Sequence, residues 1–243
     1  MYVLSTLKNL SDIVLNTVFP NKCVNCRQQR TSSAHTLCLE CWQRLAFITS
    51  PHCCLCSKPK VFEQQKCPCE FTKCTRNYYH RVRSALLYEG VAKNLIKRFK
   101  YGGHTNLQHI FAKWLYSNVA QWIEDSHVII PIPLHVRKLR ERGYNQAWLI
   151  AKLLAKHYNK ACIENALFRS RYTMSQSNLS HWERQQNILG AFMINDKYAH
   201  VFENRNVILV DDVITTGATA NECAKVLAGC GARRINILTI ART

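Results

Sequence analysis

The sequence predicts an α/β fold, a parallel sheet with helices on both faces, preceded by a small cysteine-rich module. From about residue 78 onward, short apolar strand patterns alternate with amphipathic helix patterns, which is typical of a parallel sheet. Before that point, ten of the 13 cysteines lie between residues 23 and 74. We therefore expect a short amphipathic helix at residues 1–19, a cysteine-rich module at 20–75 and an α/β domain at 76–243.

The individual elements follow from hydrophobic periodicity. Strands are predicted where four to seven mostly apolar residues follow one another, and helices where apolar residues recur three or four positions apart. In the first helix, for example, Val91, Leu95 and Ile96 share one face, and Gly102 lies beyond its end as a stop signal. The expected strands are 82–88, 127–131, 207–210 and 235–240, and the expected helices are 91–99, 107–122, 144–158 and 219–229.

The first four cysteines have the spacing C-x2-C-x11-C-x2-C. Each C-x2-C pair can form a tight turn that directs two thiolates at one ion, and two such turns complete a tetrahedral zinc site. The N-terminus lacks the pattern of a secretory signal peptide, so reduced thiolates are favoured over a secreted disulfide framework. The predicted ligands of this structural zinc are Cys23, Cys26, Cys38 and Cys41.

A second zinc ion is expected in the same module. Cys53 and Cys56 form another C-x2-C pair, but the cysteines that follow are irregularly spaced. We predict Cys69 and Cys74 as the other two ligands, and Cys54 and Cys67 remain open as substitutes. A different division of ligands between the two ions also remains open. A polar segment of this size buries little apolar surface, so the metal would supply much of its folding free energy.

The chain carries a formal net charge of +18, with 33 Lys and Arg against 15 Asp and Glu. Such an excess favours polyanionic partners, single-stranded DNA among them. One basic cluster runs through residues 76–101, and a second contains Arg137, Arg140 and Arg142. A solvated basic surface is the alternative for either cluster taken alone. No apolar run approaches the ~18 residues that span a bilayer, so we expect no stable membrane insertion.

The segment VILVDDVITTGAT, residues 207–219, places phosphate, ribose and metal ligands side by side. Asp211 and Asp212 follow a buried strand, at the sheet edge where open α/β folds bind ligands. Gly217 lets the backbone approach a phosphate closely, and the N–H groups that open the next helix point at the anion. The carboxylates can accept hydrogen bonds from ribose hydroxyls or hold Mg²⁺.

This segment resembles the signature of type I phosphoribosyltransferases, which bind phosphoribosyl diphosphate (PRPP). The resemblance implies that the fold is the parallel α/β sheet of that class. It also implies that Asp211 and Asp212 contact the ribose hydroxyls and that Mg²⁺ accompanies PRPP. The residues that would surround the 5′-phosphate are Thr215, Thr216, Gly217, Ala218 and Thr219.

Over residues 20–243 the order of motifs is similar to the competence protein F (ComF) family. The cysteine module is followed by LIKRFKYGG, PIPLHVRKLRERGYNQA, RYTMSQSNLSHWERQQNILGAF and the PRPP-like segment. The resemblance implies a cytoplasmic protein of natural transformation that handles incoming single-stranded DNA with a competence helicase as partner. It also implies that Arg137, Arg140 and Arg142 follow a sheet strand on a loop and bind pyrophosphate, with DNA phosphate as the rival ligand.

Two departures bear on catalysis. Thr215 stands where many purine-salvage relatives carry an aspartate that handles the proton of the base, and the N-terminus offers no cysteine nucleophile. An acceptor substrate is therefore not identifiable from the sequence. The alternatives to a DNA-handling protein are an active phosphoribosyltransferase with an unknown acceptor, and a scaffold that docks a helicase through its zinc ribbon.

Overall fold

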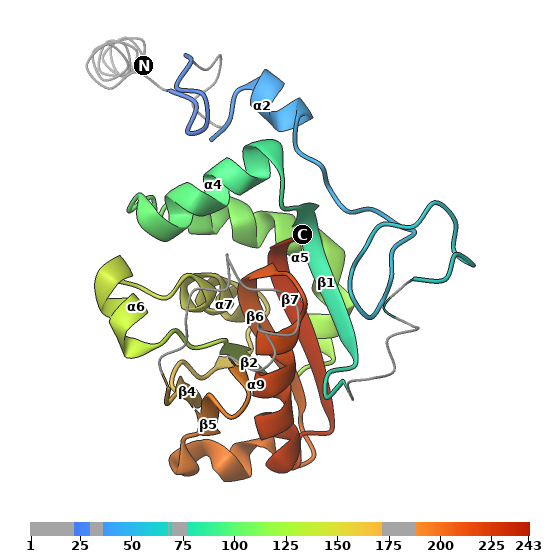
Figure 1. Ribbon diagram of the computed structural model, residues 1–243, viewed down its shortest axis with the longest axis vertical. Helices are drawn as coiled ribbons and strands as arrows, with labels where there is room; N and C mark the ends of the chain where they lie inside the picture. Colours follow the sequence, from blue (N-terminus) through green and yellow to red (C-terminus); the bar gives the residue numbers. More distant parts are fainter. Residues whose placement is uncertain (1–21, 30–35, 68, 70–76, 172–187) are drawn as a thin grey trace, which may run out of the picture. The chain divides into compact units, whose positions relative to one another are not determined.

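The structure, a computed structural model, describes residues 22–29, 36–67, 69, 77–171 and 188–243. The helix expected at residues 1–19 lies outside these residues. The chain divides into two compact units, Met1–Leu45 and Ala46–Thr243. In the described part of the first unit, a short helix, α2 (Leu39–Gln43), follows the first cysteine turn. The second unit contains the sheet, its helices and the second cysteine cluster (Figure 1).

The sheet of the second unit confirms the predicted fold class, because all four of its strand pairings are parallel. The order β1-β7-β6-β2-β3 places β6 at the centre, between β7 and β2. Neighbouring strands in this order are separated along the chain by helices, because parallel strands need a long crossover connection. The strands are β1 (Arg81–Leu87), β2 (Val128–Pro131), β3 (Ala161–Cys162), β6 (Asn206–Ile214) and β7 (Arg234–Arg242).

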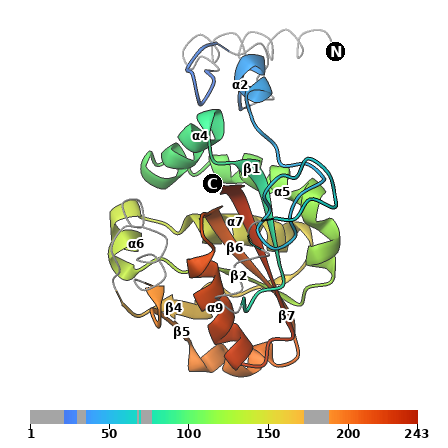
Figure 2. The same cartoon turned by 45° about the vertical axis from the view of Figure 1, so that its right-hand side comes forward.

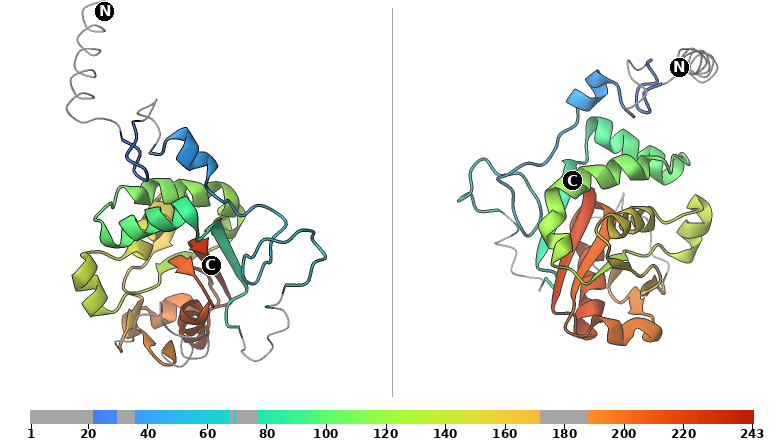
Figure 3. Two further views of the ribbon diagram at one scale, coloured as in Figure 1. Left: turned by 45° about the horizontal axis from the view of Figure 1, so that its top comes forward. Right: turned by 180° about the vertical axis from the view of Figure 1, so that it is seen from behind.

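Helices cover both faces of the sheet (Figures 1 and 3). Val207 and Leu209 of β6 share an apolar core with Cys223 and Leu227 of the C-terminal helix, and side chains alternate along a strand, so Ile208 turns to the other face. None of the described helices is long and apolar enough to cross a bilayer. The helices of this unit are α4 (Gly90–Tyr101), α5 (Leu107–Glu124), α6 (Val136–Arg142), α7 (Gln146–His157) and α9 (Ala218–Gly229).

A small antiparallel pair was not expected from the sequence. Strands β4 (Leu167–Arg169) and β5 (Phe192–Ile194) pair with each other, and a 3-10 helix, η2 (Asp196–Phe202), follows them. Strand β5 packs on α9 (Figure 2). A three-residue strand is too short to show a period in the sequence, so tertiary packing alone reveals this pair.

Strand β6 is longer than expected and includes the acidic pair. It pairs with β7 as far as Ile214 and Arg242. On the other side of β6, strand β2 ends at Pro131. The last hydrogen bond between these two chain segments joins Ile132 N to Val210 O at 2.8 Å. The prolines at 131 and 133 lack the N–H that would continue this pairing. Beyond Val210, β6 therefore has a strand neighbour on one side only, which leaves space beside the acids.

The arginines expected on a loop lie on helix α6, which corrects that prediction. The His135 Nδ1 atom accepts a hydrogen bond from Arg137 N and caps the helix. Arg137 and Glu141 form an exposed (i, i+4) ion pair at 3.6 Å, and Gly143 ends the helix at φ +78°. Helix α7 then begins as expected, because the Asn145 side chain accepts from Ala147 N.

Candidate functional site

The C-x2-C pairs that begin at Cys23 and at Cys53 form the same turn, whereas Cys38 and Cys41 lie at the start of α2. In the first, Cys23 N donates to Gln28 O at 2.8 Å and Arg27 N donates to Cys23 O at 2.8 Å. Thirty positions later, Cys53 N donates to Lys58 O at 2.8 Å and Ser57 N donates to Cys53 O at 2.7 Å. Arg27 and Ser57 both adopt positive φ, 63° and 62°. The two turns are therefore an internal structural repeat built for paired thiolates.

The first turn meets two further cysteines in its own unit. The sulfur atoms of Cys23, Cys26, Cys38 and Cys41 all lie within 4.8 Å of one another. Four thiolates at the usual zinc–sulfur distance of about 2.3 Å stand about 3.8 Å apart, so these residues fit a zinc ion. Burial raises the pKa of the Cys23 thiol, but backbone donors at Cys26, Cys38 and Asn25 outweigh it and lower that pKa to about 6.

The second cluster gathers Cys53, Cys56, Cys67 and Cys69, whose sulfur atoms also lie within 4.8 Å of one another. Cys53 and Cys69 sulfurs are 3.4 Å apart, and Cys56 and Cys67 sulfurs 3.5 Å. Cys67, left open as a substitute in the sequence, thus completes a four-thiolate site. Cys74, one of the two further ligands expected, lies outside the described residues. The described cysteines are free thiols, as zinc binding requires.

The second cluster is also tied to the edge of the sheet. Val82 N donates to Cys54 O at 2.8 Å, and Ser84 N donates to the Ser57 hydroxyl at 2.9 Å. The Arg242 guanidinium donates to Cys56 O. These bonds give β1, an edge strand, partners on its outer side. A zinc ion in this cluster would therefore brace the sheet as well as its own loop.

The acidic pair lies in the second half of β6, and its two side chains point to opposite faces of the sheet. Asp212 points to the side of α4, where its Oδ1 atom is 2.8 Å from Lys100 Nζ. Asp211 points to the side of α9 and lines a pocket with Thr215, Gly217 and Thr239. Strand alternation separates the two side chains, but both flank the open edge left where β2 ends.

Lys100 and Asp212 form an ion pair that is largely buried, with 18% and 10% of the two side chains exposed. Burial opposes the charge on Lys100, but the Asp212 carboxylate outweighs it and raises the pKa of Lys100. Asp211 adds to this effect. A diphosphate brought to this place would meet the positive charge of Lys100 beside the acids.

Asp211 has a strongly perturbed carboxyl group. Burial, followed by the negative charge of Asp212, raises its pKa to about 7 from the ordinary 3.8, although Lys100 opposes the change. Its Oδ1 atom accepts a hydrogen bond from Asp212 N at 2.8 Å. Near neutral pH this group exchanges its proton readily, so a bound cation would favour the carboxylate form.

The free energy of unfolding is expected to fall as pH rises, because of the raised pKa of Asp211. Because its folded pKa exceeds its ordinary value, the folded state binds the extra proton between about pH 4 and 7, and the free energy of unfolding falls across that window. Asp211→Asn should therefore be more stable than wild type at pH 8 by roughly 1–3 kcal/mol. A full effect would be about 1.36 kcal/mol for each pKa unit, and we expect only part of it. Urea unfolding of the zinc-loaded proteins without Mg²⁺, at pH 6 and 8, measures the difference. Exposed Glu63→Gln is the control, and an equal effect in both variants would contradict the assignment.

The turn from β6 into α9 requires glycine at position 217. Gly217 caps the helix at φ +82°, a conformation that side chains rarely adopt. A Cβ atom there would also lie 2.9 Å from the Tyr79 hydroxyl oxygen. The Thr216 hydroxyl accepts from Ala218 N at 3.3 Å and steadies the same turn. Ala218 and Thr219, at the start of α9, line the pocket beside Asp211, and the start of a helix favours an anion.

Gly217→Ala is expected to lower the free energy of unfolding by about 1–3 kcal/mol, because it adds both backbone strain and the clash with Tyr79. Gly229→Ala is the matched control at the far end of the same helix, where a Cβ meets nothing within 4 Å. We expect that change to leave stability unchanged or to raise it by up to about 1 kcal/mol. Thermal and urea unfolding compare the two. Equal losses in both variants would show that the turn is not constrained as described.

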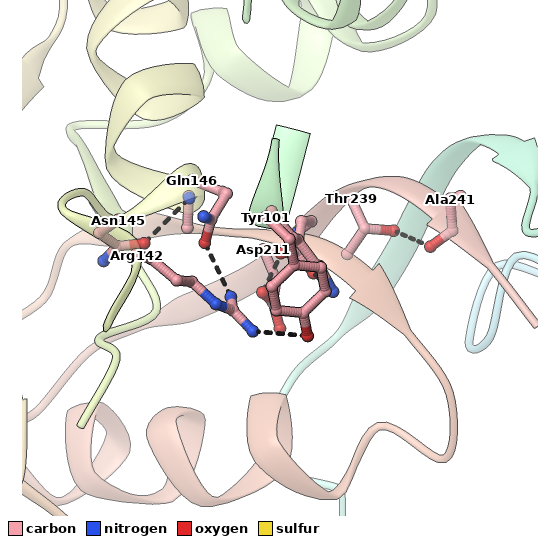
Figure 4. A network of polar contacts seen from close by, with 10 residues as sticks. Tyr101, Arg142, Asn145, Gln146, Asp211, Thr239 and Ala241 are labelled. Carbon is pink, nitrogen blue, oxygen red and sulfur yellow. Dashed lines mark hydrogen bonds and ion pairs between the residues drawn. The ribbon is translucent and has the colours of Figure 1, made fainter. Parts of the chain in front are cut away.

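Cations surround the acids on the side of α4, α6 and β4. Arg142 donates to Gln146 Oε1 at 3.0 Å and to the Tyr101 hydroxyl at 3.1 Å, and its guanidinium lies 4.9 Å from the Tyr101 ring centroid. Figure 4 shows this network together with Asp211. Burial, and then the charges of Arg169, Arg142 and Lys100, lower the pKa of Lys138. The positive charges of Arg169, Arg142 and Lys100 therefore all act on Lys138.

Of the three arginines predicted to bind phosphate, the structure brings one to the acids. Arg142 takes part in the network of Figure 4, whereas Arg137 and Arg140 are exposed on α6. Lys100 and Arg169 were not among the predicted site residues. The segment LIKRFKYGG already marked the neighbourhood of Lys100, but no local pattern distinguishes Arg169.

Comparisons with known proteins agree with these features. The family described as a double zinc ribbon domain matches residues 14–75, which supports structural zinc in the two clusters. The chain is 29% identical over 231 residues to competence protein F of Haemophilus influenzae, covering 92% of this chain and 98% of that protein. It is 25% identical to the DNA utilization protein YhgH of Escherichia coli O6:H1, over 92% and 98% of the two chains.

Solved structures with a similar fold include a hypoxanthine phosphoribosyltransferase of Staphylococcus aureus. The match covers 57% of this chain and 65% of that one, at 14% identity and a TM-score of 0.37. At that TM-score the likeness carries no conclusion about ligands. The chemistry of the site therefore depends on its own residues.

Proposed function

Because the chain is a homologue of competence protein F over most of its length, we propose that it acts in natural transformation. In this proposal it handles incoming single-stranded DNA and binds PRPP, or a related phosphosugar, together with Mg²⁺. The names of its relatives, competence protein F and DNA utilization protein, support the DNA part. A helicase partner and a cytoplasmic location stay predictions from the family resemblance.

One observation carries the sugar-phosphate part. Asp211, Asp212, the Gly217-capped start of α9 and the cations Lys100 and Arg142 lie at one end of β6. A 5′-phosphate would bind the N–H groups and hydroxyls of residues 215–219. The ribose hydroxyls would donate to the two carboxylates. The diphosphate would meet the surrounding cations, since guanidinium and ammonium groups bind phosphate oxygens by charge-assisted hydrogen bonds.

The acidic pair also suits a magnesium ion. Carboxylate oxygens are the ligands Mg²⁺ prefers, usually one or two of them together with substrate phosphates. When bound, the ion would supply positive charge that neutralises the diphosphate. Asp212 is held by Lys100 at 2.8 Å, so Lys100 would have to turn from the carboxylate to the diphosphate as the ligand enters.

The DNA part has its own test, fluorescence polarisation of a labelled single-stranded oligonucleotide at increasing salt. We expect the logarithm of the affinity to fall linearly with the logarithm of salt, by about 0.7 for each phosphate contacted. Replacing both exposed arginines of α6, Arg137→Gln with Arg140→Gln, should make that slope shallower. The control removes two charges elsewhere, Lys225→Gln with Arg233→Gln.

Two results would contradict the DNA proposal. One is the absence of saturable binding at low salt. The other is an affinity that does not change with salt, because a protein of net charge +18 that contacts phosphates must release counterions. If the slope changes equally in both double variants, we would conclude that the DNA does not bind preferentially along α6.

A further inference from the structure

A second cavity lies at the end of the sheet opposite the acids. It has a volume of about 200 Å³ and lies where β1, β6 and β7 begin, beside the last turn of α5. The C-terminus, which follows β7, marks the other end of the sheet in Figure 1. Open α/β sheets bind their ligands at the carboxyl ends of the strands, so this cavity belongs to none of the sites described above.

The polar residues of the cavity come from one face of the sheet. Arg81 pairs in register with Asn236, and Asn206 pairs with Arg234, so all four side chains point to the same side. Further along the strands this face becomes apolar, with Ile208 and Leu238 fully buried. Four polar residues thus gather where a core would ordinarily continue.

Two amide oxygens of the cavity are buried without partners. Asn206 Nδ2 donates to Asp125 O at 3.0 Å, which fixes the orientation of that amide and turns its Oδ1 atom away. Neither Asn206 Oδ1 nor Asn236 Oδ1 has a hydrogen-bond partner among the described residues, and Asn236 is only 8% exposed. Unpaired buried acceptors cost free energy. Both residues line the cavity, so an occupant that donates hydrogen bonds would satisfy these oxygens, provided that the side chains covering them move aside.

The lining also contains Asp125, but its two arginines and its tryptophan suit an anion and a flat ring. Arg81 and Arg234 are exposed, and the Arg81 guanidinium lies 6.0 Å from the ring centroid of Trp122. Trp122 is partly exposed in the cavity wall. An aromatic face beside two guanidinium groups can stack a base and bind a phosphate.

We propose that this cavity binds a nucleotide whose base carries an exocyclic amino group. The two amino hydrogens would donate to Asn206 Oδ1 and Asn236 Oδ1, the base would lie against Trp122, and the phosphate would lie between Arg81 and Arg234. The same chemistry is offered by a free nucleoside monophosphate and by one unit of a single strand. A keto group in place of the amino group cannot donate to either oxygen and repels both, so the site should reject it.

Calorimetric titration of the zinc-loaded full chain with two pairs of nucleotides tests the proposal. AMP and IMP differ by an amino group against a keto group, and so do CMP and UMP. We expect AMP or CMP to bind at least about tenfold more tightly than its keto partner. Asn236→Leu and, separately, the exposed change Arg234→Gln should each weaken that binding at least about tenfold. The double variant Asp211→Asn, Asp212→Asn should bind AMP or CMP as wild type does.

Several outcomes would overturn the proposal. If neither AMP nor CMP binds, the cavity holds water and no nucleotide. Equal affinities within both pairs would show that the amide oxygens do not select the base. Binding that survives Asn236→Leu but is lost in the Asp211, Asp212 variant would place the nucleotide at the opposite end of the sheet. If the proposal holds, an adenine oligonucleotide that displaces AMP identifies the strand as the source, and one that fails to displace it identifies the free nucleotide.

Discussion

Cys56→Ser is expected to remove one zinc ion and to destabilise the unit that contains the sheet. Cys26→Ser is expected to remove the other zinc ion and to leave the unfolding of that unit unchanged. The contrast follows from where the clusters lie, since residues 1–45 and 46–243 form separate compact units. Cys56 belongs to the second unit and Cys26 to the first.

The reason for the large effect is the contact between the second cluster and β1. The turn between Cys53 and Ser57 provides acceptors for Val82 N and Ser84 N, and Arg242 of β7 donates to Cys56 O. Structural zinc contributes about 10–16 kcal/mol to the folding of small zinc peptides. We therefore expect Cys56→Ser to lower the free energy of unfolding of the sheet unit by at least about 3 kcal/mol.

Two measurements check this expectation. Elemental analysis should find two zinc ions per wild-type chain and one in each variant. Thermal unfolding followed through the sheet should move down by about 2–4 °C per kcal/mol in Cys56→Ser and stay in place in Cys26→Ser. Equal shifts in the two variants, or full zinc content in either, would contradict the account.

The sequence predicted four of the five strands of the parallel sheet, all but β3, and the four cysteines of the first cluster that the structure brings together, because both are encoded locally. Apolar runs such as residues 207–210 mark buried strands, and the C-x2-C spacing is itself the geometry of the turn. The extent of β6 was not predictable in this way. Asp211 and Asp212 are polar, so local pattern ends the strand before them, whereas pairing with β7 continues it to Ile214.

The cation cluster shows the other limit of local reasoning. Lys100, Arg142 and Arg169 come from α4, α6 and β4, and only the tertiary fold brings them near the acids. The sequence identified Arg142 from its basic neighbourhood, but that neighbourhood equally included Arg137 and Arg140, which are exposed. The density of charge along the chain therefore identified the basic segment, but it could not show which of the three arginines lies near the acids.

The irregular second cysteine cluster falls between these cases. The pair Cys53 and Cys56 was recognisable by spacing, and its turn repeats the first one closely. Cys67 and Cys69 are separated by one residue, which matches no standard zinc turn. The fold brings their sulfur atoms within 4.8 Å of the first pair, a closeness that depends on how the intervening loop returns.

Loss of PRPP binding is the second large effect expected. Asp211→Asn with Asp212→Asn keeps the shape of both side chains but removes the charges that would hold Mg²⁺ and accept from the ribose hydroxyls. It also leaves Lys100 beside a neutral amide, since Asp212 is its ion-pair partner at 2.8 Å. We expect affinity for PRPP with Mg²⁺ to fall at least about 100-fold, as the loss of two charged acceptors implies.

Isothermal titration calorimetry of the zinc-loaded protein with PRPP and Mg²⁺ tests the central claim most directly. It should be run on wild type, the double Asp211→Asn, Asp212→Asn variant and Glu63→Gln, an exposed change outside the site. The account predicts saturable binding to wild type and Glu63→Gln, and its loss in the double variant. Absence of binding to wild type, or equal binding to all three, would contradict a working sugar-phosphate site at the end of β6.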